Sequence, residues 1–288
     1  MSAVTRVLVI AVNYNSDREA RTWLAALARV TAGLPPGQVT PMVVDNTSRA
    51  KSEEFFRTLR AVHPSVITVK APGNLGYFGG AAHGWAAWQQ VGGVQPDWVM
   101  VSNVDVDFAD ASFFPTLLNA DYPAGTGVVG PTIVSAARKG DWNPKISRRP
   151  SAQTMRRYVW LYRSHWIFNL YEQAARVKYA LASWRAKGTT SPAPQGEALV
   201  PAYAVHGACM LFRRDYFERG GDLRYPSFLF GEEVFVAETA RRLDLSTWHD
   251  PRLKLVSQDH VSTGRFRTKA MTKYMRDSAV VLVERYFS

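Results

Sequence analysis

The sequence predicts an α/β protein built on a mostly parallel, doubly wound sheet, and three observations lead to this fold class. Up to residue 118, short apolar runs alternate with segments that repeat apolar residues at helical spacing. Such alternation is typical of parallel strands joined through helices. The apolar runs are continuous, as expected of strands buried on both faces. Polar residues collect where the runs end, and ligands bind at this edge of an open sheet.

The elements follow one another in regular order. Strands are expected at 6–15, 39–48, 65–71 and 97–108. Helices are expected between them at 17–30, 52–62 and 73–91. The first helix carries apolar residues at helical spacing, the second has Ser52 as a candidate cap, and the third opens with a Gly-rich turn. The sheet pattern returns at 200–217 and 253–262, and a helical tail follows at 268–287.

The segment 138–195 differs in character from the rest of the chain. It begins basic and turn-rich, and 156–188 then has long helical potential with aromatic residues on more than one face. One interpretation is a helical element packed on the core, with Arg and Lys side chains reaching water. The other is a surface for an anionic membrane or a lipid-linked acceptor.

Composition limits the class of protein. The chain has 288 residues, of which 47% are hydrophobic and 20% charged, so it can form a real core and is not expected to be disordered. Its only cysteine, Cys209, cannot form an internal disulfide and lies in an apolar stretch. The net charge of +11 suits polyanions without choosing among them. No run approaches the roughly 20 apolar residues of a membrane span, so we expect a soluble or peripheral protein.

Acidic residues gather directly after an apolar run at 98–101, as Asn103, Asp105, Asp107 and Asp110. Carboxylates this close repel one another unless a positive charge lies between them. The cluster therefore predicts either a solvated loop rich in Asp or a divalent cation at the carboxyl end of a strand.

Three further motifs each allow a structural and a functional interpretation. Glu232 and Glu233 lie at an expected helix start. They would either be ordinary acidic residues of the first turn, which the helix dipole favours, or supply a general base. His260 follows a strand and would be a structural residue or a metal ligand. The glycines of 74–84 match neither a dinucleotide fingerprint nor a P-loop, and they predict a tight turn or a phosphate-contacting helix start.

Taken in order, these motifs resemble those of family 2 glycosyltransferases, and more narrowly the bacterial rhamnosyltransferase-like members that build surface polysaccharides. The motifs lie at 12–15, 43–48, 74–84, 101–108, 206–217, 228–234 and 259–262. The resemblance implies a GT-A fold with a Rossmann-like nucleotide-binding half and an acceptor-binding half. The implied single domain, 1–288, has a nucleotide-sugar half at 1–118, an acceptor half at 119–262 with a basic helical insertion at about 138–195, and a C-terminal helix at 263–288.

The resemblance also implies roles for residues. The D-x-D motif of the family falls on Asn103 to Asp105, and a literal D-x-D runs from Asp105 to Asp107, so the implied ligands of Mg²⁺ or Mn²⁺ are Asp105, Asp107 and His260. The implied nucleotide-binding residues are Asn13, Asn15, Asp45, Asn74, Gly76 and Asn103, with Asp45 at the base. Glu233 takes the place of the usual catalytic Asp in an acidic pair with Glu232.

The implied activity is inverting transfer of a sugar, with rhamnose favoured, from a dTDP- or UDP-linked donor to a glycan or lipid-linked acceptor. The expected location is cytoplasmic, with peripheral contact to the inner face of the plasma membrane through 138–187, and nucleic acid is not an expected partner. Two alternatives stay open: a catalytically silent nucleotide-sugar-binding protein and a sugar-nucleotide nucleotidyltransferase.

Overall fold

The structure is a computed structural model that describes residues 6–50, 52–92, 94–135, 140–174, 196–257 and 268–288. The chain divides into two compact units. The sheet unit comprises Met1–Arg148, Glu197–Tyr225 and Glu232–His260, and the helical unit comprises Arg149–Gly196, Pro226–Gly231 and Val261–Ser288. Whether one functional domain spans the chain, as the resemblance implies, stays a prediction.

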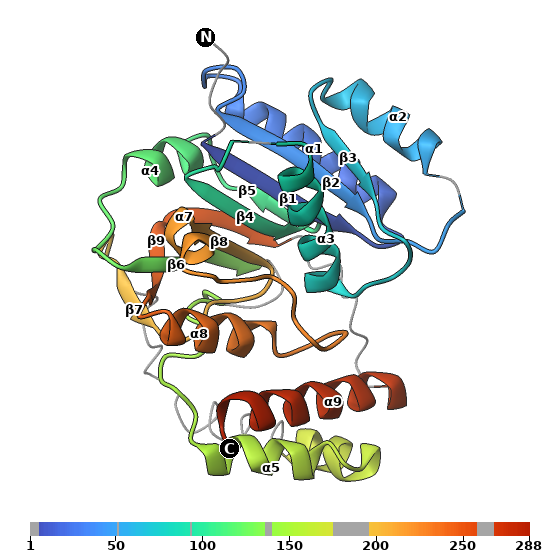
Figure 1. Cartoon of the computed structure of the whole chain (residues 1–288), viewed down its shortest axis with the longest axis vertical. Helices are drawn as coiled ribbons and strands as arrows, with labels where there is room; N and C mark the ends of the chain where they lie inside the picture. The colour runs from blue at the N-terminus through green and yellow to red at the C-terminus, as the bar shows by residue number, and fades with distance from the viewer. Residues whose placement is uncertain (1–5, 51, 93, 136–139, 175–195, 258–267) are drawn as a thin grey trace. The chain divides into compact units, whose positions relative to one another are not determined.

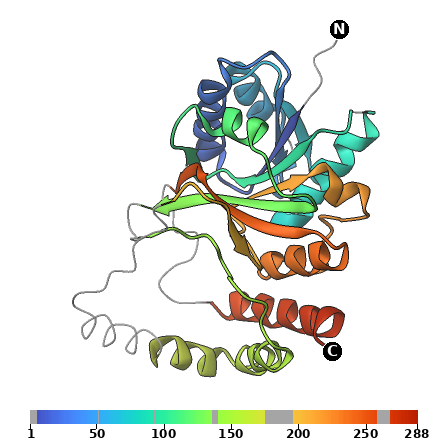
Figure 2. The same cartoon turned by 90° about the vertical axis from the view of Figure 1, so that its left-hand side faces the viewer.

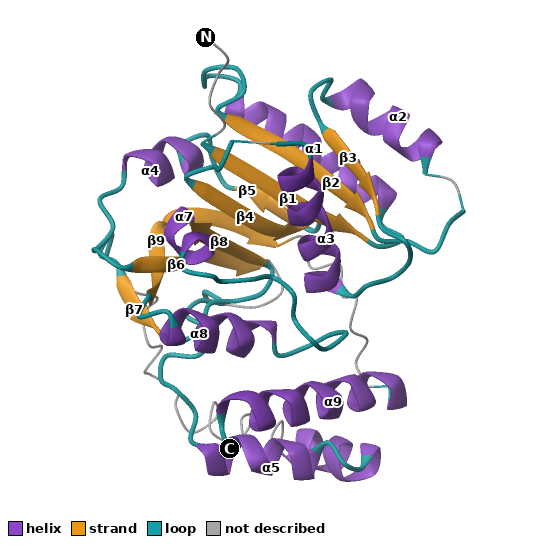
Figure 3. Cartoon of the chain, in the orientation of Figure 1, coloured by secondary structure: helices purple, strands orange, loops and turns teal. Residues whose placement is uncertain are grey.

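The sheet unit is an α/β layer structure (Figures 1 and 3). Its strands are β1 (Val7–Asn13), β2 (Val39–Asp45), β3 (Ile67–Lys70), β4 (Trp98–Asn103), β5 (Val106–Phe108), β6 (Thr126–Ser135), β7 (Val200–Ala202), β8 (Cys209–Arg213) and β9 (Ser246–Ser257). Its helices are α1 (Asp17–Thr31), α2 (Glu53–Val62), α3 (Tyr77–Gln90), α4 (Phe113–Asn119), α7 (Arg214–Glu218) and α8 (Glu232–Arg242). The strand order is β3-β2-β1-β4-β8-β6-β9-β5, with β7 beside β9.

The sheet is parallel in its first half and mixed in its second. β1 pairs in parallel with β2 and with β4, and β2 pairs in parallel with β3. β6 also pairs in parallel with β9. β8 runs antiparallel between β4 and β6, while β5 and β7 run antiparallel to β9. The predicted α/β class is confirmed.

One predicted strand is wrong in its extent. The run 97–108 was expected to form a single strand, but β4 ends at Asn103 and β5 pairs with β9 instead of continuing along β1. The turn at 104–105 redirects the chain, and it leaves Asp105 at the carboxyl end of β4 while Asp107 lies in β5.

Helices cover both faces of β1, which is what a doubly wound sheet requires. The side chains of Val7 and Val9 join a core cluster with Trp23 and Leu27 of α1. On the opposite face, the close neighbours of α3 are Ile10 and Val12. Successive side chains of a strand point to opposite faces, so one continuous apolar run can satisfy both layers.

The glycines of α3 serve close packing of this helix on the sheet. A Cβ added at Gly84 would lie 2.7 Å from Val44 Cγ2, 3.1 Å from Met42 Sδ and 3.2 Å from Ile10 Cγ2. Gly76 differs, because it caps the helix at φ 75°, a conformation that favours glycine. The predicted Gly-rich turn is therefore confirmed, and its later glycines pack against strands.

We expect Gly84→Ala to lower the free energy of unfolding by about 1–3 kcal/mol, because the methyl group would overpack the interface with β1 and β2. Chemical denaturation followed by circular dichroism measures this change. Gly33→Ala is the matched control, since a Cβ there meets nothing within 4 Å. Equal stability of both variants would contradict the packing role of Gly84.

The helical unit contains α5 (Ala152–Leu161), a helical segment at 165–174 and α9 (Lys269–Tyr286). Figures 1 and 2 show α5 and α9 side by side. The Arg149 guanidinium lies 4.5 Å from the centre of the Phe287 ring and donates to the Tyr286 carbonyl oxygen at 3.0 Å. The long helix expected over 156–188 is interrupted at 162–164, and its part beyond 174 lies outside the described residues. Among the helices that the structure describes, none is both long and apolar enough to cross a bilayer.

Candidate active site

The polar strand ends share one edge of the sheet, as the sequence predicts. Asn13 at the end of β1 is in register with Asp45 at the end of β2. On the other side of β1, Val12 is in register with Asn103 at the end of β4. The carboxyl ends of these three strands therefore lie side by side, at the edge where open α/β sheets bind ligands.

Asp45 is fully buried and holds the loop that follows β2. Its carboxylate accepts hydrogen bonds from the hydroxyls of Ser52 and Thr47, the latter at 2.7 Å. Arg49 Nε lies 3.2 Å from Asp45 Oδ2, and Lys70 Nζ lies 3.5 Å from the same oxygen. In this structure the side chain that the resemblance assigns to base recognition is held by Thr47, Arg49 and Ser52 of the following loop.

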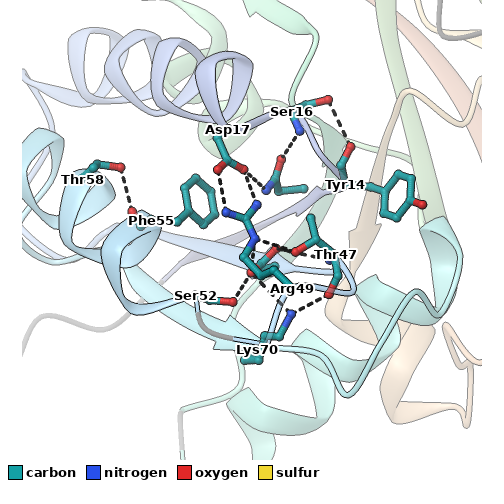
Figure 4. A network of polar contacts seen from close by, with 11 residues as sticks. Tyr14, Ser16, Asp17, Thr47, Arg49, Ser52, Phe55, Thr58 and Lys70 are labelled. Atoms are coloured by element: carbon teal, nitrogen blue, oxygen red, sulfur yellow. Dashed lines mark hydrogen bonds and ion pairs between the residues drawn. The ribbon is translucent and has the colours of Figure 1, made fainter.

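Asn13 and Asn15 shape the turn between β1 and α1. The buried Asn13 side chain donates to Asp17 Oδ1 at 2.9 Å and accepts from the Ser16 amide at 3.1 Å. Arg49 donates to both Asp17 oxygens, at 2.7 and 2.5 Å (Figure 4). The Arg49 hydrogen bonds hold the pKa of Asp17 below its usual value and outweigh the partial burial that would raise it. Asn15 has a left-handed backbone with φ 54°, which Asn tolerates in turns.

Asn46 is a structural residue of this edge that sequence reasoning missed. Its amide donates to the Gly76 carbonyl oxygen at 2.9 Å, and its Oδ1 accepts from the Leu75 amide at 3.0 Å. Asn74 accepts from the Gly76 amide at 3.0 Å, so it closes the same turn from within. The side chains at 46 and 74 thus join the end of β2 to the start of α3. The one signal in the sequence is that Asn46 directly follows Asp45 at the end of an expected strand.

The acidic turn after β4 lies beside the turn that leads into β8. The Asn103 amide donates to the Ala208 carbonyl oxygen at 2.9 Å, and Ser102 pairs with Cys209. Gly207 lies against the catalytic candidate Glu233, since a Cβ at Gly207 would be 3.4 Å from Glu233 Oε1. The structure thereby brings the turn that carries Asp105 and the helix that carries Glu233 to the two sides of one short turn.

The two carboxylates of the acidic pair lie in different environments. α8 begins at Glu232, as the sequence predicts, and both acids occupy its first turn. Glu232 is 8% exposed, whereas Glu233 is more exposed and borders Gly207. A carboxylate that must reach a substrate hydroxyl needs access to that hydroxyl, so the geometry favours Glu233 as the base.

Tyr77, the first residue of α3, is a second residue of the site that the sequence did not single out. Its hydroxyl oxygen is buried, and no hydrogen-bond partner for it lies among the described residues. Burial raises its pKa well above the usual value, and proximity to Cys209, Glu232, Asp105 and Glu233 raises it further. The Tyr77 hydroxyl is therefore held in its neutral form.

Cys209 is a structural residue, as expected. It is fully buried at the start of β8, and burial raises the pKa of its thiol, so the neutral form predominates.

Asp107 is placed away from this arrangement. In β5 it pairs with Val256, its carboxylate lies 3.4 Å from Arg29 Nη2, and it accepts from the amide of Phe108 at 2.8 Å. The structure therefore separates the two D-x-D registers, because Asp105 lies in the turn after β4 and Asp107 lies in β5 beside Arg29 of α1. His260 lies outside the described residues.

The residues present suit a hard divalent cation. Carboxylate oxygen is the ligand type of Mg²⁺ and Mn²⁺, and Mg²⁺ is commonly held by one or two carboxylates together with substrate phosphates. Asp105 supplies such an oxygen at the edge where a diphosphate would lie. Within the described ranges, no group of three or more His, Cys, Asp or Glu residues forms a ready-made metal cluster.

A buried polar network holds the turn at 206–208 in place. The Asn143 side chain accepts from the His206 amide at 2.7 Å and donates to the Pro131 carbonyl oxygen at 2.7 Å. Asp141 accepts from the Asn143 amide at 2.9 Å and from Thr132 Oγ1 at 2.7 Å, and its Oδ2 lies 3.1 Å from His249 Nε2. The start of the segment predicted to be a basic insertion is thus part of the framework of the site.

Acid should weaken this framework. Burial would raise the pKa of Asp141, but hydrogen bonds from His249, Thr132 and backbone amides outweigh it and lower the pKa below 3.8. Asp141 therefore stabilises the fold above about pH 4, and this stabilisation is lost as pH falls through the lowered pKa.

We expect Asp141→Asn to lower the free energy of unfolding by about 1–3 kcal/mol at pH 7, with the difference from the wild type shrinking below pH 4. Urea denaturation from pH 7 to 3 measures this, with Asp121→Asn at an exposed position as the control. A deficit independent of pH would contradict it.

Comparisons with known proteins agree with this architecture. No protein-family model and no curated protein sequence matches the chain. Among solved structures, the chain is similar to the mannosyltransferase PcManGT from Pyrobaculum calidifontis, solved with GDP-Man and Mn²⁺, at a TM-score of 0.52 and 14% identity over 98% of this chain and 74% of that one. The fold is that of the GT-A glycosyltransferases. GalNAc-T7, solved with UDP, GalNAc and Mn²⁺, is also similar, at a TM-score of 0.54 and 11% identity over 89% of this chain. This chain spans 44% of the length of GalNAc-T7.

Proposed function

We propose that the protein is a metal-dependent, inverting glycosyltransferase that moves a sugar from a nucleotide-diphosphate donor to an acceptor hydroxyl. The observation that carries the proposal is that the turn at 206–208 contacts both Asn103, which leads into the turn of Asp105, and Glu233, at the carboxyl edge of a GT-A sheet. A carboxylate base and a site for a diphosphate are the two groups that such a transfer needs.

The donor is proposed to lie along the edge formed by the ends of β1, β2 and β4. Asn13, Asp45, Asn74 and Gly76 shape the loops of this edge, and Asn103 leads into the acidic turn. Asp105, together with His260 as the resemblance implies, would hold Mg²⁺ or Mn²⁺. The cation supplies positive charge that stabilises the leaving diphosphate.

Glu233 is proposed to act on the acceptor. Its carboxylate takes the proton of the acceptor hydroxyl, the oxygen forms a bond to the anomeric carbon, and the bond from that carbon to the diphosphate oxygen breaks. Attack from the face opposite the leaving group inverts the anomeric configuration. This chemistry needs one carboxylate base and not the two carboxyl groups of a glycoside hydrolase.

The finer proposals rest on the resemblance of the sequence motifs. A dTDP- or UDP-linked donor, transfer of rhamnose and a glycan or lipid-linked acceptor fit the bacterial rhamnosyltransferase-like members of family 2. These enzymes build surface polysaccharides, so we place the protein in the cytoplasm at the inner face of the plasma membrane.

A thermal-shift panel tests the proposal. UDP, dTDP, GDP and CMP are each added with Mg²⁺, Mn²⁺ or EDTA. A ligand at 100 times its dissociation constant stabilises the native state by about 2.7 kcal/mol, which is measurable as a raised melting temperature. A shift with one pyrimidine diphosphate that EDTA abolishes is the expected result. A folded protein that responds to none of the nucleotides would overturn the proposal. If the donor binds but an activity assay detects neither sugar transfer nor donor hydrolysis, the protein is instead a catalytically silent nucleotide-sugar-binding protein.

A further inference from the structure

The helical segment 165–174 carries its apolar side chains on the outside of the protein. Trp166 is 79% exposed, Ile167 41%, Leu170 73% and Tyr171 54%. Residues at positions i, i+1, i+4 and i+5 lie on one side of an α-helix. We call these four side chains the outward face.

The other side of this helix is more polar and faces inward. His165 Nδ1 lies 3.1 Å from the hydroxyl oxygen of Thr272, which is buried on α9, and Asn169 Nδ2 lies 3.0 Å from His165 Nε2. Phe168 is the buried apolar residue of this side, with its ring 5.0 Å from that of Tyr162. A surface helix of a soluble protein has the opposite arrangement. Large apolar side chains exposed together mark a surface that binds something.

The chemistry around the outward face identifies its partner. Trp160, at 62% exposure, adds a further exposed ring in the preceding helix α5. Trp and Tyr concentrate at the boundary between lipid and water, where one part of the ring is buried and the other stays polar. Arg156, Arg157 and Arg163 are exposed in the same stretch, and no Asp or Glu occurs from 142 to 171. Positive charge beside an apolar helical face is typical of helices that lie in an anionic membrane interface.

A second copy of the chain fits this surface less well. Pairing two outward faces would bring together segments that carry Arg156, Arg157 and Arg163 but, among the described residues from 142 to 174, a single carboxylate, that of Glu172. Such an excess of like charge opposes association. An anionic lipid surface complements the same charges.

We propose that the outward face of residues 165–174 docks the protein peripherally on an anionic lipid bilayer. The inference concerns the helical unit and does not depend on the proposed function. It narrows the broad surface at 138–187 that the sequence suggests to one helical face and its neighbouring Arg side chains.

Sedimentation with lipid vesicles tests the inference on the full chain. We expect wild-type protein to bind vesicles of phosphatidylcholine with phosphatidylglycerol, and to bind pure phosphatidylcholine vesicles at least about tenfold more weakly. The double variant Trp166→Glu, Leu170→Glu should lose at least about tenfold in binding to the anionic vesicles, because it places charges in the apolar layer. Both positions are exposed, so its melting temperature should equal that of the wild type.

A matched control separates the face from net charge. Val91→Glu with Val94→Glu replaces two valines of the sheet unit that are 75% and 60% exposed, and it changes the charge by the same amount. This control should bind vesicles like the wild type. Replacing Arg156, Arg157 and Arg163 by Gln should weaken binding to anionic vesicles at least about tenfold and leave the weak binding to phosphatidylcholine unchanged.

Three outcomes would overturn the inference. The first is that wild-type protein sediments with neither kind of vesicle. Alternatively, the face variant and the valine control could lose binding equally, which would make the effect one of net charge. A wild-type dimer in analytical ultracentrifugation that the face variant dissociates, without vesicle binding, would assign the face to a second copy. Because Glu233→Gln leaves this surface intact, it should bind vesicles like the wild type even if the proposed transfer reaction is wrong.

Discussion

Glu233→Gln is expected to lower the rate of sugar transfer about 10²–10⁴-fold while donor binding stays unchanged. Gln keeps the size and shape of Glu but cannot take the proton of an acceptor hydroxyl. The residue lies in the first turn of α8 with Oε1 against Gly207, where the backbone leaves room because a side chain is absent. The loss should therefore appear in kcat at saturating donor, and the thermal shift caused by the nucleotide should be retained.

Glu232→Gln is the control for this prediction, because it changes the neighbouring carboxylate in the same turn. Glu232 is buried, so we expect its replacement to affect stability more than the chemical step. If transfer survives in Glu233→Gln and is lost in folded Glu232→Gln, the base is Glu232. If transfer survives in both variants, the acidic pair has no catalytic role.

The elements of the sheet unit could be predicted because each has a strong local pattern. β1 is a continuous apolar run buried on both faces, and α1 repeats Trp23, Leu24 and Leu27 at helical spacing. The division of 97–108 into β4 and β5 could not be predicted, because it depends on β9, whose pairing residues lie far along the chain. Local pattern shows that a segment is extended, but it does not identify the neighbouring strand.

The candidate site was predictable in its residue types and less so in their roles. The sequence places Asp45 at a strand end, but only tertiary contacts show that Ser52, Thr47 and Lys70 surround its carboxylate. Asn143 supports the turn at 206–208 from 63 positions away, which no short motif can reveal. Tyr77 was missed because its importance lies in a buried hydroxyl, and burial of one atom is not a property of the sequence around it.

The second prediction with a large expected effect concerns which of the two D-x-D motifs binds the metal. The two motifs differ in whether Asp105 alone, or Asp107 as well, is a ligand. Asp105 lies in the turn after β4, which is bonded through the Asn103 amide to the turn at 206–208 that borders Glu233. Asp107 lies in β5, with its carboxylate beside Arg29 of α1. We expect Asp105→Asn to abolish the metal-dependent part of donor binding, since the amide keeps the shape but removes the negative charge that attracts the cation.

Asp107→Asn is the matched variant, at the second position of β5 and two residues after Asp105. It should retain metal-dependent donor binding and lose only a partly exposed ion pair, worth about 0–1 kcal/mol of stability. Isothermal titration with the nucleotide in Mn²⁺ and in EDTA measures both variants. Loss of the metal effect in Asp107→Asn and its survival in Asp105→Asn would assign the cation to the later register. That result would also separate the metal from Glu233 and Tyr77, and would remove the geometric basis for placing donor and base at one site.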